Sequence, residues 1–439
     1  NIMNVVSADE FGTIAEGSVG EFLKFMPGIS ITFEEGDAAE VSMDGVPSNY
    51  VPFTVGGFNL ASANSTFPGM DDAGRTTQLG QSSLNNVARI EVAFTPTPEI
   101  SGGALAGSIN LVPRSAFERS KPVVDWSTYI TTRQNERDIR KTPGPNGRMM
   151  RKVFPGFNFT YIKPVNKRFG FTLSAATSTS FTPVAQSRGT SRGAGAPTNG
   201  NQFPDTTPDM PYRTEVNYND SLRLTNRSSF AATVDYRLGA NDRISFSFQY
   251  ALNDVEHNGN RQTFLVDRVL PGNFSNTYTH SAVGGGTIQK QGGTYDSGGV
   301  TYMPTLSYRH DGPVWRSVVG LGHSHATGII KDGPENGRWQ SHFSRRTGVT
   351  VSFDDLSYLR PGRITVTDGQ TGQPIDPYRL DTYLLATGGT NRRTSADLKR
   401  SAFANIGRDF FGRVPLAIKA GIDVAHQMRD VRGENAGFT

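Results

Sequence analysis

The stretch RISFSFQYAL, residues 243–252, decides the fold class because polar and apolar side chains alternate along it without a break. One face of an extended chain carries Ile244, Phe246, Phe248, Tyr250 and Leu252, and the other carries Arg243, Ser245, Ser247, Gln249 and Ala251. A period of two residues is typical of a β-strand with only one face buried. The run is longer than the roughly five or six residues of most strands and matches a tilted strand that crosses a membrane.

The same alternation recurs along the chain after Ala116. It predicts nine strands, near residues 122–133, 151–163, 168–181, 227–238, 242–254, 300–310, 313–326, 396–408 and 414–428. Tight links such as GAN before Asp242 alternate with long connections at 182–226, 255–299 and 327–395. Short turns on one side and long loops on the other are typical of an outer-membrane β-barrel. Within the last connection, GVTVSFDD and GRITVTDGQTG are interpreted as a hairpin that rises from a loop.

Composition excludes several other classes of protein. The 439 residues include no cysteine, which excludes disulfides and thiolate metal sites. The net charge of +4, with both signs spread along the chain, gives no nucleic-acid footprint. The sequence contains no run of 18 apolar residues, so no transmembrane helix is predicted. No Ser/His/Asp or paired-carboxylate arrangement stands out, so we expect neither an enzyme nor a bound cofactor.

A metal site was considered at His323 and His325, which share one face of a predicted strand. That face also carries Trp315, Val319 and Leu321, so we interpret it as the lipid-facing side and expect no metal.

Nine strands cannot close a single-chain bacterial barrel, which needs an even number, and an open edge cannot persist in lipid. We therefore expect the sequence to be the front part of a longer protein of roughly 900 residues with a 22-stranded barrel. The predicted fold is mainly β: a small α+β domain over residues 1–117, then an incomplete antiparallel transmembrane β-barrel over 118–439.

The N-terminal residues have a different texture. Val19, Phe22, Leu23 and Met26 form one apolar helical stripe, which Pro27 and Gly28 end. Short predicted strands follow at GISITF, AEVSMDG, PFTVGGF, ARIEVAF and GSINLVP, separated by turn residues. The pattern predicts a compact α+β domain ahead of the barrel.

Three segments of this domain, taken together, resemble the plug domain of TonB-dependent outer-membrane receptors. They are VGEFLKFMPGISI (19–31), VSMDGVPSNYVPFTVGGFNLAS (41–62) and RIEVAFTPTPEISGGALAGSINLVPR (89–114). The resemblance gives structural roles to Pro27, Gly28, Gly45, Arg89, Glu91, Gly102, Gly103, Gly107 and Asn110. The small residues in the third segment allow close backbone approach.

Two departures from that family concern the charges that hold a plug in its barrel. Asp44-Gly45 stands where relatives commonly have Arg-Gly, and Gly56-Gly57 stands where an acidic residue or Asn often precedes Gly. The resemblance therefore transfers no residue for this latch, which we expect to be absent or rewired.

The resemblance implies energy-coupled uptake of a scarce nutrient across the bacterial outer membrane. The implied partners are TonB with its inner-membrane energising complex, through a segment expected upstream of Asn1, the outer-membrane lipid, and a small-molecule or oligosaccharide ligand. Candidate ligand contacts are Tyr50, Phe67 and Asp71 in the N-terminal domain and Tyr212, Trp339 and His342 in the loops. The alternatives are that Phe53 and Phe58 pack the domain core and that strand-end aromatics form an interfacial girdle.

Substrate identity stays open in the sequence. Loops rich in Gly, Asn, Ser and Tyr favour an oligosaccharide, whereas ferric siderophores or corrinoids would use the same mechanism. A passive porin-like or adhesin-like barrel, whose N-terminal domain is not a plug, is the other class of function.

Overall fold

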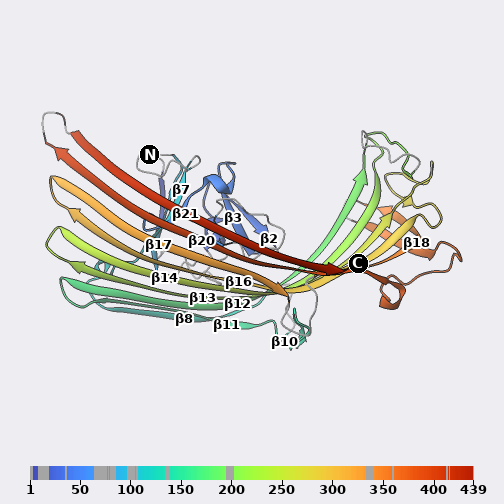
Figure 1. Ribbon diagram of the computed structural model, residues 1–439, viewed down its shortest axis with the longest axis horizontal. Coiled ribbons are helices and arrows are strands. Elements are labelled where there is room, and N and C mark those ends of the chain that lie inside the picture. The colour runs from blue at the N-terminus through green and yellow to red at the C-terminus, as the bar shows by residue number, and fades with distance from the viewer. Residues whose placement is uncertain are drawn as a thin grey trace.

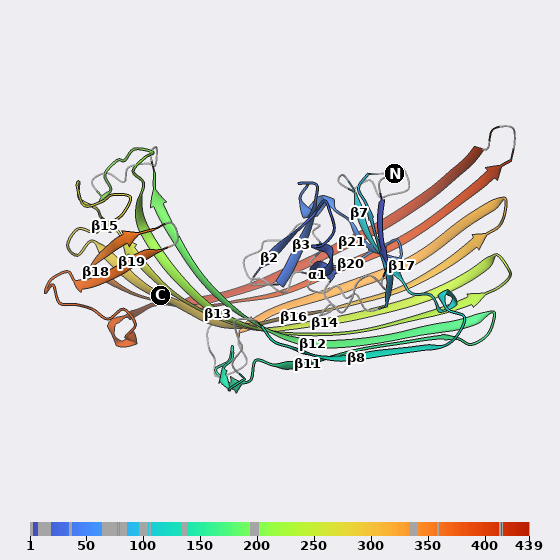
Figure 2. The ribbon, with the colours of Figure 1, turned by 180° about the vertical axis from the view of Figure 1, so that it is seen from behind.

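The computed structural model describes residues 3–7, 19–34, 37–63, 77, 79, 86–95, 104, 107–133, 139–193, 202–332, 341–357, 360–411, 414 and 416–438. They form an N-terminal domain and a long, curved antiparallel sheet that we call the wall (Figure 1). The N-terminal domain lies on the concave side of the wall, as the view from behind also shows (Figure 2).

A five-stranded sheet and a separate hairpin build the N-terminal domain. The sheet has the order β1-β6-β7-β4-β5, with bounds β1 (Met3–Ser7), β4 (Phe53–Val55), β5 (Phe58–Asn59), β6 (Val87–Ala93) and β7 (Ser108–Pro113). The other elements are helix α1 (Val19–Leu23), the hairpin strands β2 (Ile29–Glu34) and β3 (Asp37–Met43), and the 3-10 turns η2 (Ser48–Tyr50) and η4 (Ala116–Glu118). The predicted helix and the predicted short strands are thereby confirmed.

The apolar stripe of α1 is the centre of the domain core. Val19 and Leu23 are completely buried, and Phe22 and Met26 are nearly so. They pack with apolar residues of β3, β4, β6 and β7, and Met303 of the wall joins the same cluster. The core is therefore completed by the wall itself.

Nine strands follow one another across the wall in the described part of the chain. They are β8 (Val123–Thr131), β11 (Phe154–Pro164), β12 (Phe169–Arg192), β13 (Tyr212–Arg237), β14 (Asp242–Val266), β16 (Gly286–Asp311), β17 (Trp315–Asp332), β20 (Leu384–Phe410) and β21 (Leu416–Phe438). Each pairs antiparallel with the next. Every one overlaps a strand predicted from alternation, so the predicted positions are confirmed.

Alternation along each wall strand separates an inward from an outward face. On β14, Ser247 and Asn253 point inward and are buried, whereas Phe246 and Leu252 point outward and remain 44% and 37% exposed. Outward Leu321 and Ile422 are exposed in the same way, at 56% and 64%. An apolar face left uncovered by protein is what a lipid-facing wall requires.

The strands run farther than the sequence predicts. β12, β13 and β14 contain 24, 26 and 25 residues, so much of the predicted loops 182–226 and 255–299 is strand, and those loop assignments were wrong. At about 3.3 Å per residue, 26 residues span roughly 85 Å, about twice the full thickness of a bilayer. Outside the lipid both faces can be polar, so the alternating signal fades although the ladder continues.

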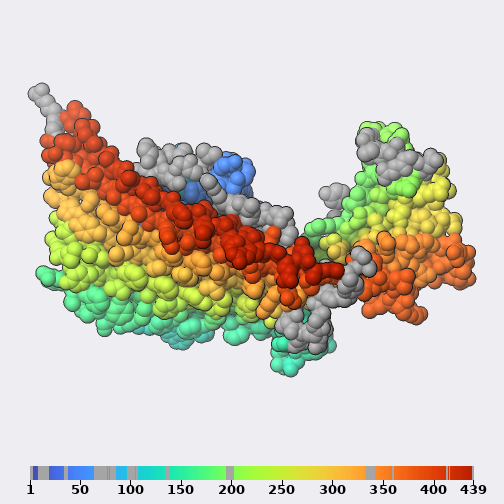
Figure 3. Space-filling view, in the orientation of Figure 1, coloured from blue at the N-terminus to red at the C-terminus, as the bar shows by residue number. Residues whose placement is uncertain are grey.

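The outer ends of the wall carry a second packed body, which we call the outer unit. It contains β15 (Thr279–His280), β18 (Ser341–Leu356), β19 (Pro361–Asp368) and the 3-10 turn η6 (Leu380–Thr382). β18 and β19 form the predicted hairpin, which is thus confirmed, and β18 also pairs with the outer ends of β16 and β20. Its apolar core includes Phe264, Ile288 and Val351. A broad hollow separates this unit from the N-terminal domain (Figure 3).

A small hairpin covers part of the convex side of the wall. Its strands are β9 (Thr142–Pro143) and β10 (Met149–Met150). Asn146 donates a hydrogen bond of 2.7 Å to Glu256, and the Lys152 ammonium lies 4.5 Å from the centre of the Phe181 ring. Among the described residues, none of the helices has both the length and the apolar character to cross a bilayer.

Candidate functional site

The segment after β5 of the N-terminal domain is pressed closely against the wall. The Phe58 ring lies 5.0 Å from the Phe403 ring of β20, centre to centre. Two wall glycines make room for it: a Cβ on Gly320 would lie 2.7 Å from Phe58, and one on Gly322 would lie 2.6 Å from it. The alternative that Phe53 and Phe58 are core residues is confirmed, because they are only 2% and 3% exposed.

Three polar contacts hold the same segment. The completely buried Asp397 of β20 accepts a hydrogen bond of 2.9 Å from the main-chain amide of Ser62. The Lys399 ammonium donates to the carbonyl oxygen of Leu60 at 2.9 Å and lies 3.8 Å from Asp397. Ser324 of β17 accepts from the amide of Ala61 at 2.9 Å. The wall thus supplies side chains and the N-terminal domain supplies main-chain groups.

A second wall carboxylate holds the segment that leaves the domain. Asp235 of β13 accepts hydrogen bonds from the Ser115 hydroxyl at 2.7 Å and from the Ala116 amide at 2.9 Å. Ser245 of β14 donates to its other oxygen at 2.5 Å. Ser115 also begins η4 as a capping box with Glu118, a Ser-x-x-Glu pattern that can be read from sequence.

A third contact of the N-terminal domain involves only neutral groups. Asn86, which precedes β6, donates to Thr233 of β13 at 3.1 Å and accepts from Thr172 of β12 at 3.2 Å. All three side chains are buried. Together with Asp235 and Asp397, this amide attaches the N-terminal domain to the wall at three places, before β6, after β7 and after β5.

Several motif residues of the N-terminal domain join into one hydrogen-bonded chain. Glu91 accepts from Arg89 and from Asn110, each at 2.9 Å, and Asn110 in turn accepts from the amide of Gly57 at 3.0 Å. The Gly56-Gly57 departure therefore has a structural use, since both residues have positive φ, 59° and 87°, in the turn between β4 and β5.

Gly107 lies where no side chain fits. Its φ is 118°, and a Cβ there would lie 1.9 Å from the carbonyl oxygen of Ala93 on β6. Gly28 and Gly45 also have positive φ, 75° and 78°, at turns. Pro27 lies in the turn between α1 and β2.

The hollow above the N-terminal domain is bordered by cationic inward positions. We compared the inward positions of 178–188 on β12, 217–229 on β13, 249–261 on β14 and 291–303 on β16, all of which the structure describes. They include Arg188, Arg223, Arg227 and Arg261, and no aspartate or glutamate. These positions lie on one face of the sheet because the strands pair without a break in register, with Arg223 opposite His257 and Arg227 opposite Asn253.

The predicted ligand residues are scattered rather than gathered. Tyr50 is 41% exposed at the end of η2, and His342 is exposed on β18, opposite Gly292 of β16. Tyr212 is 1% exposed, donates a hydrogen bond to the Pro204 carbonyl at 2.7 Å and packs on Phe274. This burial argues against direct ligand contact by Tyr212, because its ring and hydroxyl are both used inside the outer unit. Phe67, Asp71, Gly102, Gly103 and Trp339 lie outside the described residues.

The wall carboxylates were not singled out from the sequence. Asp235 and Asp397 occupy polar positions of alternating strands. A charged residue at such a position can face solvent as readily as it can make a buried contact. The sequence signal for such a carboxylate is an aspartate on the inward face of a strand with small hydroxyl residues around it on that face.

Comparison with known proteins identifies the N-terminal part. Residues 1–108 match the family model described as TonB-dependent Receptor Plug Domain. No curated protein sequence matches the chain.

Several solved structures are similar to the whole chain. The ferric enterobactin receptor mutant R480A from Pseudomonas aeruginosa has 9% identity and a TM-score of 0.39, covering 97% of this chain and 78% of that one. The siderophore receptor PiuA from Acinetobacter baumannii has 11% identity and a TM-score of 0.35, covering 98% and 62%. The ferric citrate transporter FecA in its unliganded form has 9% identity and a TM-score of 0.32, covering 98% and 74%.

The family match covers the domain that lies against the concave side of an antiparallel, lipid-facing wall. Residues 1–108 are therefore a plug domain of the kind found in TonB-dependent receptors, and the strands that follow it in the chain form the wall.

Proposed function

We propose that this receptor takes up an anionic nutrient by TonB-dependent transport, and that the nutrient is an acidic oligosaccharide. One observation carries the anionic part: in the four described wall segments named above, the inward positions contain three arginines that are at least partly exposed, Arg188, Arg227 and Arg261, and no carboxylate. A cleft lined by one sign of charge attracts a ligand of the other sign. Arginine also binds carboxylate, sulfate and phosphate groups through paired hydrogen bonds.

The oligosaccharide part rests on the Gly, Asn, Ser and Tyr content of the loops. Tyr50 and His342, both exposed, stay in the proposal as ligand contacts, together with Phe67, Asp71 and Trp339. An anionic ferric siderophore is the second candidate, because the arginines favour it equally.

We place the division between plug and barrel at residue 117, within η4 (Ala116–Glu118) and before the first wall strand. In the proposed cycle the ligand binds between the outer unit and the plug, and TonB then pulls on the plug. The contacts of Asp235 and Asp397 are those that this pull would have to break.

The ligand class can be tested by titrating the full-length receptor in detergent with three sets of compounds. These are neutral oligosaccharides, uronate- or sulfate-bearing oligosaccharides, and anionic ferric siderophores. We expect the acidic oligosaccharides to bind, and we expect Arg188→Gln and Arg261→Gln to weaken their binding. Arg316→Gln, near the short turns and paired with Asp409, is the matched control. Preference for neutral glycans would contradict the anionic proposal, and binding of ferric siderophores alone would contradict the oligosaccharide.

Energy coupling needs a separate measurement in cells. Uptake of the bound ligand should stop when TonB is removed, whereas binding at the surface should persist. Uptake that continues without TonB would instead indicate a passive porin-like barrel.

A further inference from the structure

A row of three basic side chains crosses the outward face of the wall. His323 on β17, Arg400 on β20 and His426 on β21 are direct cross-strand partners. Alternation places them on the same side as outward Leu321 and Val424, opposite to Ser324 and Asp397, which contact the plug. The row therefore faces the membrane rather than the lumen.

The row lies at the outer margin of the apolar band. Trp315 and Leu416 stand at the short-turn ends of β17 and β21, eight and ten residues before His323 and His426. Membrane strands of about 9–11 residues span the hydrocarbon, so the row lies at the headgroup level of the outer leaflet. Tyr250 and Tyr302 are paired across β14 and β16 and lie on the same face as the row. Along their strands they are one same-face position farther from the short turns than the row is. Tyrosines at this level are typical of a membrane interface.

On the described strand segments around the row, no outward position carries an acidic group. The outward positions of 244–252 on β14, 300–308 on β16, 315–327 on β17, 398–410 on β20 and 416–428 on β21, all described, contain no aspartate or glutamate. Arg400 is exposed, and within the described chain its guanidinium has no hydrogen bond or ion pair. An unpaired arginine at a lipid-facing position destabilises a barrel by up to about 2–4 kcal/mol at the bilayer midplane and less near the interface.

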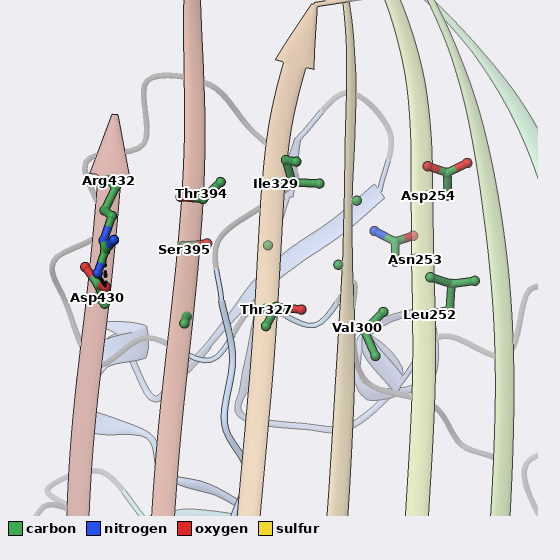
Figure 4. A pocket seen from close by; sticks show the side chains of 14 residues that line it. Leu252, Asn253, Asp254, Val300, Thr327, Ile329, Thr394, Ser395, Asp430 and Arg432 are labelled. Carbon is green, nitrogen blue, oxygen red and sulfur yellow. Dashed lines mark hydrogen bonds and ion pairs between the residues drawn. The ribbon is translucent and has the colours of Figure 1, made fainter. Parts of the chain in front are cut away.

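An apolar hollow lies beside this charge. It has a volume of about 470 Å³, and its lining joins the three basic residues to Phe246, Leu306, Leu321 and Val424. A second hollow of about 600 Å³ lies farther out on the same strands (Figure 4). Its lining includes Gly298 and Gly328 between Leu252, Val300 and Ile329, together with the Asp254 carboxylate and the Asp430–Arg432 ion pair. A cation next to the first, apolar hollow fits an amphiphile with an anionic head and hydrocarbon chains.

We propose that His323, Arg400 and His426 form a binding site for the phosphate group of an outer-leaflet lipid, whose acyl chains occupy the apolar hollow on the inner side of the row. Charge complementarity selects the phosphate, since the Arg400 guanidinium meets no carboxylate in the described part of the chain. The position selects a lipid over free phosphate, since the row adjoins hydrocarbon-lined surface on its inner side. Arg400 is the main contact, because it is charged at every physiological pH, and the histidines add donors at its two sides.

Native mass spectrometry of the full-length receptor in detergent tests this site with three probes. The probes are a phosphorylated lipid A, the same lipid after removal of its phosphates, and inorganic phosphate. The intact receptor should retain the phosphorylated lipid preferentially, and Arg400→Gln should weaken retention about fivefold, the effect of about 1 kcal/mol per cation at an anionic membrane surface. Arg400→Lys should restore most of it.

Arg408→Gln is the matched control, because Arg408 lies on the same face of the same strand at the other margin of the band. Its guanidinium lies over Trp315 at 5.0 Å and over Phe410 at 4.7 Å. Unchanged retention in Arg400→Gln, or equal loss in Arg408→Gln, would overturn the site. Equal retention of the dephosphorylated lipid would overturn the phosphate contact, and competition by inorganic phosphate at the same concentration as the lipid would overturn the lipid as ligand.

Discussion

Asp397 in wall strand β20 accepts a hydrogen bond of 2.9 Å from the main-chain amide of Ser62, which lies 335 residues earlier in the chain. Asp235 makes the corresponding contact with Ala116 at 2.9 Å. The family's usual charge latch was expected to be absent or rewired because of Asp44-Gly45 and Gly56-Gly57. Among the described residues, the plug contributes amides and a hydroxyl to these two carboxylates, and the ammonium beside Asp397, that of Lys399, comes from the wall itself.

We expect Asp397→Asn and Asp235→Asn each to weaken plug attachment by about 1–3 kcal/mol, because hydrogen bonds to a charged group are stronger than those to an amide. Ion conductance of the full-length receptor in planar bilayers, recorded at rising urea, should then increase at lower urea than for the unmodified protein. Asp430→Asn is the control, since Asp430 pairs with Arg432 on the outward face. Equal urea dependence of all four proteins would show that these contacts do not hold the plug.

Gly322→Ala should destabilise the fitted plug by about 1–3 kcal/mol through overpacking, because its Cβ would lie 2.6 Å from Phe58. Phe58→Leu should relieve the clash, so the double variant should be more stable than the sum of single effects predicts. Thermal unfolding in detergent measures all three. Gly193→Ala, which meets no atom within 4 Å, should be neutral. Strict additivity at positions 322 and 58 would contradict the contact.

Gly107→Ala should reduce the stability of the plug more than Gly45→Ala does, although both residues have positive φ, 118° and 78°. A Cβ at Gly45 meets nothing within 4 Å, so that variant measures the backbone cost alone, about 1–3 kcal/mol. At Gly107 the clash with the Ala93 carbonyl is added. Limited proteolysis of the plug reports the difference, and similar protease resistance of the two variants would refute it.

Asp296 should make stability depend on pH. Burial, and then the neighbouring Glu256 carboxylate, raises the pKa of Asp296 from 3.8 to about 6. Because the folded-state pKa exceeds the unfolded value, the fold favours the protonated acid, and this group's contribution falls as pH rises from about 4 to about 6.

Asp296→Asn should therefore raise the thermal midpoint at pH 7.5 and leave it unchanged near pH 4. Asp125→Asn, which changes an exposed carboxylate on β8, serves as the comparison. A gain of equal size at both pH values would mean that the effect does not come from ionisation of Asp296.

The wall was predictable where lipid imposes a rule on the sequence. Phe246, Phe248 and Leu252 must be apolar because they face the membrane. The residues between them in the sequence face inward and can be polar. The rule ends at the membrane surface, so the outer half of β13, with Glu215 and Asn217 among its residues, was assigned to a loop. Hydrogen bonding with β12 and β14, which no local pattern encodes, continues those strands.

The candidate site was less predictable because its contacts join distant segments. Tyr212 was predicted to contact the ligand from a loop, but the fold of the outer unit covers it with Phe274. Asp235 and Asp397 resemble many surface carboxylates until the plug is placed beside them. Phe58, in contrast, was expected to pack in the domain core as the alternative to a ligand contact in this segment, and its burial agrees with that interpretation.

Anchoring through main-chain amides makes the two sides of the latch unequal in what mutation can do to them. Every amino acid except proline presents the same N–H at positions 62 and 116, so the plug can change those side chains, within the space available, and stay attached. The wall has no such freedom, because only an acceptor of the right reach at 235 and 397 completes the bond. In a library of single substitutions selected for a closed receptor, proline should therefore be the substitution most consistently excluded at 62, whereas at 397 nearly all should be.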